Sequence, residues 1–295
     1  MYSRETKRQA IIDWRYSVYT NSSDNLFEYL FGDCVIKNIL LKGKDIDKIK
    51  YPEPFYPSFY NNINIHSPPE LNSEKIYKDQ RQKEIDAQKI RNLHHFSENT
   101  IIMNESVRIF PYWEKPNDKV KEFINIIWKL LPEDILSHMQ KTYSEIFANK
   151  EKIIGVHLRF GNRDKGFDFF LKKRSKSYCG QSIKEYIQQQ IIPIIQPFFN
   201  THYIYIATDT EEAINISKEL IPNCIIYNKW FAEPGYELHF SAVYNQISNG
   251  LEILKDALTE IFLLSHCEKI FAIYKNSAFT NIAGMLNRCP SVVFV

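Results

Sequence analysis

From about residue 150 onward, short apolar segments alternate with longer segments in which apolar residues recur at helical spacing. The short segments predict strands at 152–158, 202–210, 223–228, 269–275 and 291–295. The longer segments predict helices at 180–199, 211–221, 251–267 and 277–288. Strands that alternate with helices form a mainly parallel sheet with helices on both faces. We therefore predict an α/β domain over residues 151–295.

Residues 1–150 are less regular, and we expect a separate N-terminal domain there. The predicted elements are strands at 8–14 and 34–41, a proline- and tyrosine-rich loop at 48–73, and two helices within 117–147. The two helices are interrupted before Pro132, because the residue that precedes a proline is biased away from helical conformation. The segment 145–152 is the expected joint between the two halves.

Charge and cysteine content exclude several classes of protein. The chain of 295 residues has 37 basic and 35 acidic residues, a net charge of +2, which gives no general support for nucleic-acid binding. Its five cysteines are scattered and lack C-x-x-C spacing, which disfavours a disulfide framework or a zinc site and fits a reducing compartment. The N-terminus has no apolar signal region, and no apolar run is long enough to span a membrane. We expect a cytoplasmic protein, and association with a membrane surface stays open.

Three motifs of other enzyme classes are absent from the sequence. There is no G-x-G-x-x-G for a dinucleotide, no G-x-x-x-x-G-K-[ST] for a P-loop and no G-x-S-x-G for a serine hydrolase. The adjacent His94 and His95 do not have the spacing of a metal site and are interpreted as surface or packing residues.

The first polar cluster follows the predicted strand at 152–158. Its members are His157, Arg159, Gly161, Asn162, Arg163 and Asp164. Ligands in open α/β sheets bind at the carboxyl ends of the strands, so this cluster is a candidate site. The guanidinium of Arg159 can pair with a phosphate through two hydrogen bonds. The alternative is an exposed turn whose charges are only solvated.

The second cluster, Thr208, Asp209 and Thr210, ends the strand at 202–210 and begins the next helix. A carboxylate here could contact a nucleotide or a sugar. The alternative is a helix cap, in which Asp209 or Thr210 accepts hydrogen bonds from the first turn.

The third cluster, Asn276, Ser277 and Thr280, lies where the strand at 269–275 is followed by a helix. Backbone N–H groups and hydroxyls at such a position suit phosphate. A simple cap by Asn276 or Ser277 is the alternative. Together the three clusters indicate a sugar-nucleotide site, in which cationic side chains and helix dipoles would stabilise a leaving diphosphate without a metal.

Three of these segments carry a family resemblance. The stretches GVHLRFGNRD, YIATDTEEA and LKDALTEIFLLSHCEKIFAIYKNSAFTNIAGML resemble, in this order, three motifs of the GT-B α1,6-fucosyltransferases, and of the rhizobial nodulation protein Z family in particular. QAIIDWR, near the start, resembles a strand of the N-terminal domain in that family. The resemblance extends over about 150–288 and is patchy before that.

The resemblance implies a GT-B-like fold of two Rossmann-like domains that face a cleft, with residues 1–150 on the acceptor side and 151–295 on the side of the GDP-sugar. It also implies inverting transfer, no metal and no cofactor beyond the GDP-sugar donor. Arg159 would hold the diphosphate. Asp164, by its closeness to the first motif, is the first candidate for the catalytic base, and Asp168 is the second. The alternative is that both are solvated loop carboxylates. The remaining donor-binding residues would be His157, Gly161, Asn162, Arg163, Asp209, Thr210, Glu260, Ser277, Ala278, Phe279 and Thr280.

The chain also departs from the family pattern. Phe160 stands where relatives often have a second basic residue, and Thr210 where many have a second aspartate. The chain starts near the end of the first helix of the family, so its N-terminal domain is expected to be incomplete. The sequence thus predicts transfer of fucose from GDP-fucose to an oligosaccharide or lipid-linked glycan in cell-surface glycan synthesis. The alternatives are a non-catalytic GDP-sugar- or glycan-binding relative and a transferase for another GDP-linked sugar.

Overall fold

A computed structural model describes residues 26–31, 55–56, 100–101, 118–160, 182–233, 250–273, 277–286 and 291–294. The chain divides into two compact units, one of residues 1–17 and 22–113 and one of residues 18–21 and 114–295. In the first unit, the described elements are helix α2 (Leu26–Phe31) and the parallel two-residue strands β1 (Phe55–Tyr56) and β2 (Thr100–Ile101). The strands predicted at 8–14 and 34–41 lie outside the described residues.

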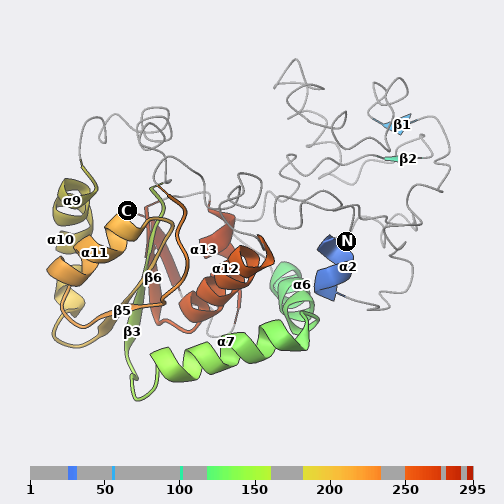
Figure 1. Ribbon diagram of the computed structural model, residues 1–295, viewed down its shortest axis with the longest axis horizontal. Coiled ribbons are helices and arrows are strands. Elements are labelled where there is room, and N and C mark those ends of the chain that lie inside the picture. Colours follow the sequence, from blue (N-terminus) through green and yellow to red (C-terminus); the bar gives the residue numbers. More distant parts are fainter. Residues whose placement is uncertain are drawn as a thin grey trace. The chain divides into compact units, whose positions relative to one another are not determined.

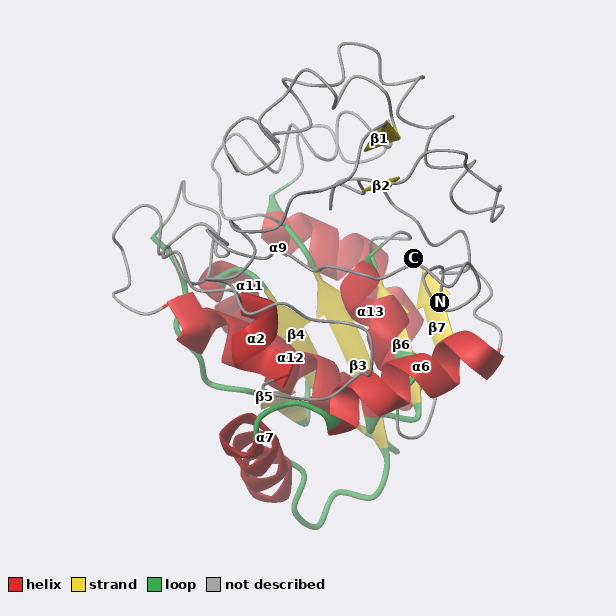
Figure 2. Ribbon diagram, turned by 90° about the vertical axis from the view of Figure 1, so that its right-hand side faces the viewer, coloured by secondary structure: helices red, strands yellow, loops and turns green. Residues whose placement is uncertain are grey.

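The second unit is built on a parallel sheet of five strands (Figures 1 and 2). The strands are β3 (Ile153–Leu158), β4 (Tyr203–Thr208), β5 (Cys224–Ile226), β6 (Lys269–Ala272) and β7 (Ser291–Phe294). Their order is β5-β4-β3-β6-β7, with every neighbouring pair parallel. The chain therefore runs outward from β3 to β5 and then returns to place β6 on the other side of β3. The point between β3 and β6 is a topological switch point, where doubly wound sheets bind ligands.

Helices cover both faces of this sheet, as the alternating pattern predicts (Figure 1). The helices of the unit are α6 (Asp118–Lys129), α7 (Glu133–Ile146), α9 (Ile183–Tyr186), α10 (Ile192–Ile195), α11 (Glu211–Leu220), α12 (Gly250–Ser265) and α13 (Ala278–Ala283). One hydrophobic cluster joins β3 and β4 to α9, α10 and α11. A second cluster joins the opposite face to α12 and α13. All six residues of β3 are buried, as befits the central strand.

Helix α6 ends before Pro132 and helix α7 begins directly after it, as predicted. Both belong to the second compact unit, although they precede the joint expected at 145–152. Helix α7 packs against α12, and Phe147, directly after α7, contacts the ring of Tyr205 edge-on at 5.4 Å between centroids. These contacts explain why α7 belongs to the compact unit that contains the sheet.

The helix predicted over 180–199 is one helical segment with a change of pitch. It begins after Ser182, which forms a capping box with Glu185: the Glu185 N–H donates to the Ser182 hydroxyl, and the Ser182 N–H donates to the Glu185 carboxylate. A π-helical turn (Ile187–Ile191) precedes α10, and a 3₁₀ turn (Gln196–Phe198) follows it. Pro193 lacks an N–H and its ring crowds the preceding turn, and a widened turn relieves that conflict.

Gly155, in the middle of β3, allows α12 to approach the sheet closely. A Cβ atom at this position would lie 2.8 Å from Cδ2 of Leu264 and 3.1 Å from Sγ of Cys267. Both neighbours are fully buried, so neither can move aside into solvent. The close approach fixes the distance between α12, which carries Glu260, and the sheet.

Candidate functional site

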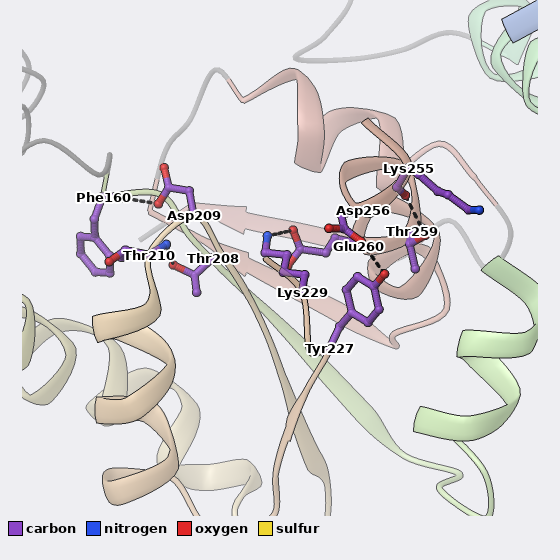
Figure 3. A network of polar contacts seen from close by, with 10 residues as sticks. All are labelled: Phe160, Thr208, Asp209, Thr210, Tyr227, Lys229, Lys255, Asp256, Thr259 and Glu260. Carbon is purple, nitrogen blue, oxygen red and sulfur yellow. Dashed lines mark hydrogen bonds and ion pairs between the residues drawn. The ribbon is translucent and has the colours of Figure 1, made fainter. Parts of the chain in front are cut away.

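A hydrogen bond to the side chain of Asp209 connects the segments that follow the carboxyl ends of β3 and β4 (Figure 3). Leu158 and Thr208 form the last pair of the ladder, and beyond them Asp209 Oδ1 accepts a hydrogen bond from the Phe160 N–H at 3.0 Å. Thr210 takes the N-cap position of α11 but makes no side-chain cap hydrogen bond, and its N–H donates to the Thr208 hydroxyl at 3.4 Å. The Asp209 carboxylate therefore links the end of β4 to the backbone that follows Arg159, a contact that the capping alternative does not predict.

His157 is the second-to-last residue of β3 and is buried, with 6% of its surface exposed. Its ring stacks on Phe279 of α13, with centroids 4.9 Å apart and planes at 10°. Burial, followed by the charges of Arg159 and Lys229, lowers the pKa of His157 to about 3. The imidazole is therefore neutral at physiological pH. It can shape the site and form hydrogen bonds, but it cannot supply positive charge to a diphosphate.

Arg159 directly follows β3, and its side chain is exposed. Phe160, next in the chain, is 2% exposed, and its ring meets Tyr186 edge-on at 5.8 Å between centroids. The side chain at 160, where relatives often have a second basic residue, therefore packs in the core. Of the first polar cluster, Gly161, Asn162, Arg163 and Asp164 lie outside the described residues, as does Asp168. Among the residues the structure describes there, the positive charge at the end of β3 is that of Arg159.

The first turn of α13, which carries Ser277 and Thr280 of the third cluster, contacts His157 of the first cluster through Phe279. Ser277 is the N-cap residue of α13, is 1% exposed and makes no side-chain cap hydrogen bond. Its hydroxyl has no hydrogen-bond partner within the described part of the chain. Thr280 is fully buried and its hydroxyl donates to the Ser277 carbonyl at 3.2 Å, so it stabilises the helix start. Ala278 is the first residue of α13, and Phe279 reaches back to His157.

Lys229 and Glu260 form a buried ion pair near these strand ends. Lys229, in the loop after β5, donates a hydrogen bond to the carboxylate of Glu260 on α12 (Figure 3). Burial raises the pKa of Glu260, and Lys229 acts in the opposite direction. One turn earlier, Asp256 accepts a hydrogen bond from the Tyr227 hydroxyl at 2.6 Å. The sequence predicted Glu260 from the resemblance but missed Lys229, although its position just after a strand of the sheet is the available signal.

A cavity of about 460 Å³ lies beside the ion pair, between α11 and the segment that starts with β5. Its lining residues are Glu211, Ile214, Asn215, Lys218, Cys224, Ile226, Tyr227, Asn228, Lys229 and Phe231. Neither His157 nor Arg159 lines it, so the cavity is distinct from the surface at the end of β3 and shares only Lys229 with the ion pair.

Two further searches bear on the class of site. Within the described ranges, no group of three or more His, Cys, Asp or Glu side chains could hold a metal ion. No helix among the same residues combines the length and apolarity needed to cross a membrane.

The parallel sheet, with polar side chains at its switch point, defines the doubly wound class of α/β domain, in which ligands bind at that point. The family described as Nodulation protein Z (NodZ) matches residues 1–292, and the chain belongs to that family. The family resemblance drawn from the three motifs is thereby confirmed. Among curated relatives, Nodulation protein Z of Bradyrhizobium diazoefficiens is 25% identical over 99% of this chain and 74% of its own length. That of Sinorhizobium fredii is 22% identical over 96% of this chain and 83% of its own.

Solved structures share the fold of this chain. NodZ α-1,6-fucosyltransferase soaked with GDP-fucose superposes with a TM-score of 0.65 at 20% identity, over 97% of this chain and 84% of that one. The same enzyme co-crystallised with GDP gives a TM-score of 0.64 at 18% identity, over 96% of this chain and 83% of that one. At these identities the similarity establishes the fold, and the predicted GT-B-like fold class is confirmed.

Proposed function

We propose that this protein transfers fucose from GDP-fucose to a hydroxyl of an oligosaccharide acceptor. The observation that carries the proposal is the family match over residues 1–292, joined to a strand-end site of the kind that binds nucleotides. Membership of this family confirms the predicted class of enzyme, a fucosyltransferase-like glycosyltransferase, since a solved relative is an α-1,6-fucosyltransferase soaked with GDP-fucose. The donor and GDP as leaving group come to this chain from those relatives.

In the proposed mechanism, the exposed guanidinium of Arg159 binds the diphosphate and stabilises the charge that develops as it leaves. Neutral His157 forms the floor of the same pocket, and Asp209 fixes the backbone that carries Arg159. The Ser277 hydroxyl, which has no hydrogen-bond partner among the described residues, is available to a phosphate or sugar oxygen. Glu260 contacts the nucleotide from α12. Gly161, Asn162, Arg163, Thr210, Ala278, Phe279 and Thr280 stay predicted members of the donor pocket.

The finer features of the reaction are also proposals. We infer inversion at the sugar carbon without a metal, as the family resemblance implies, with Arg159 in the electrostatic role that a metal takes in other transferases. Asp164 is the predicted base that takes the proton of the acceptor hydroxyl. The proposed setting is cell-surface glycan synthesis in the cytoplasm, at the inner membrane surface when the acceptor is lipid-linked.

A second candidate is a GDP-sugar-binding relative that does not catalyse transfer. The observation that favours it is the buried Phe160, which stands where relatives often have a second basic residue. A transferase for another GDP-linked sugar is a third candidate, because the motifs report on GDP more than on the sugar.

Two measurements separate these candidates. Thermal unfolding with GDP, UDP and CMP tests the nucleotide, because a ligand that binds only the folded state raises its stability. Stabilisation by UDP and not by GDP would overturn the donor assignment. Incubation with GDP-fucose and oligosaccharides, with and without a chelator, then tests the reaction. Fucosylated product at an unchanged rate in chelator supports the proposal, and binding of GDP without product or hydrolysis supports the non-catalytic relative.

A further inference from the structure

The ion pair between Lys229 and Glu260 is unusual in its burial. Only 3% of the Lys229 side chain and 6% of the Glu260 side chain are exposed. Removing two charges from water is unfavourable, and a buried pair often contributes less to stability than apolar side chains of the same size would. Its position within the site offers a functional reason for the pair.

Lys229 follows the carboxyl end of β5, which pairs in parallel with β4, so the ion pair lies at the same edge of the sheet as the candidate donor site. The charge of Lys229 lowers the pKa of His157, and the charge of Asp209 raises the pKa of Glu260. The pair thus lies within reach of both strand-end clusters. The Lys229 ammonium is also held 5.3 Å from the centroid of the Phe231 ring, a favourable position for a cation.

The geometry leaves part of the carboxylate available. Lys229 donates to Oε2 of Glu260, and Oε1 makes no hydrogen bond to any residue that the structure describes. A carboxylate repels a diphosphate, so Glu260 must face the other half of a nucleotide. The base and the ribose carry N–H and O–H donors, which an ionised carboxylate accepts and a protonated one accepts less well.

Building on the proposed function, we propose that Lys229 is a positioning residue of the donor site: its ammonium holds the Glu260 carboxylate oriented and ionised toward the nucleoside half of the GDP-sugar. Lys229 itself touches neither the nucleoside nor the phosphates. Its role is to pair one oxygen of Glu260 so that the other is presented to the ligand in a fixed direction.

The test is calorimetric titration of the full chain with GDP and with guanosine, which lacks phosphates, at about pH 6 and about pH 8.5. Burial already raises the pKa of Glu260, and removal of Lys229 raises that pKa further. Lys229→Met is therefore expected to weaken binding of both ligands about tenfold at the lower pH and less at the higher pH. Lys229→Arg, which keeps the charge, is expected to restore most of the affinity. Lys269→Met is the matched control, because Lys269 lies 5.4 Å from the Phe271 ring at the opposite end of the strands.

A double-mutant cycle covers the case in which Lys229→Met does not fold, since it leaves a buried carboxylate unpaired. In a Glu260→Gln background Lys229 has no charge to hold, so adding Lys229→Met is expected to change GDP affinity less than about twofold. A loss for GDP without a loss for guanosine would overturn the proposal, because it would assign Lys229 to the phosphates. A loss independent of pH, or one that persists in the Gln background, would also overturn it. These readouts are binding constants, so they stand even if the wild-type protein fails to transfer fucose and the proposed function falls.

Discussion

The Asp209 carboxylate accepts a hydrogen bond from the Phe160 N–H at 3.0 Å, and so joins the end of β4 to the residue that follows Arg159. The two residues are 49 positions apart in sequence. The last residues paired between β3 and β4 are Leu158 and Thr208, and this side-chain bond connects the two chain segments just beyond that pair. A residue predicted to cap a helix or to touch a sugar therefore also fixes the direction in which Arg159 leaves the sheet.

This relationship predicts that Asp209→Ala lowers both stability and activity. An N–H left without its acceptor costs about 1–3 kcal/mol, and a displaced Arg159 should lower kcat/KM for GDP-fucose by about 10–100-fold. Asp209→Asn keeps an acceptor oxygen and should restore the stability. Urea unfolding and initial rates check both values. Equal stability of the Ala and Asn variants would contradict the bridging role.

A second prediction concerns His157 and pH. The pKa of His157 is about 3 in the folded protein against 6.5 for an unperturbed histidine, so the unfolded chain binds the extra proton between these values. The contribution of His157 to stability is complete above about pH 6.5 and is lost as pH falls toward the folded pKa. Acidification from about pH 6.5 to pH 4 should therefore lower the free energy of unfolding by on the order of 3 kcal/mol through His157 alone.

The measurement is the free energy of unfolding across this pH range for the wild type and for His157→Gln, which cannot titrate. The variant loses the stack on Phe279 and should be less stable at neutral pH. Its stability should nevertheless fall less steeply with acid than that of the wild type. Parallel pH curves for the two proteins would show that His157 is not buried as a neutral ring.

The elements of the second unit could be predicted from the sequence because each depends on a local repeat of apolar residues. The five strands and the helices α11 and α13 form within the predicted ranges, and α12 begins one residue before its range. The π-helical turn before Pro193 was not predicted, because it depends on how one helix accommodates a proline that the surrounding core keeps in place.

The site could be predicted only in part, because its key contacts join residues far apart in sequence. His157, Arg159, Asp209 and Ser277 could be predicted as candidates because strand ends mark them, and the structure brings the carboxyl ends of β3, β4 and β6 to one edge. Their roles stay predictions. Lys229 was missed because its partner, Glu260, is 31 residues away and no motif links them. The alternative that the Thr210 side chain caps α11 was wrong: Thr210 occupies the N-cap position, but its side chain accepts no cap hydrogen bond.

Gly155 gives a prediction about packing. In Gly155→Ala the new methyl would lie 2.8 Å from Leu264 Cδ2, and overpacking of this kind costs about 1–3 kcal/mol. Adding Leu264→Val, which shortens the opposing side chain, should make the double variant more stable than the sum of the single effects. Chemical unfolding of the four proteins measures this coupling. Additive losses would show that α12 does not rest on β3 at this point.

Arg159 provides the most direct test of the account, because the proposed reaction depends on its charge at the diphosphate. Arg159→Ala should lower kcat for transfer from GDP-fucose by about 100-fold or more, and Arg159→Lys should restore only part of it because an ammonium cannot form the forked pair. Because the side chain is exposed, the melting temperature should stay unchanged. Lys152→Ala, an exposed charge before the opposite end of β3, is the matched control and should leave the rate intact. A wild-type rate for Arg159→Ala would contradict the assignment of this site to the departing GDP.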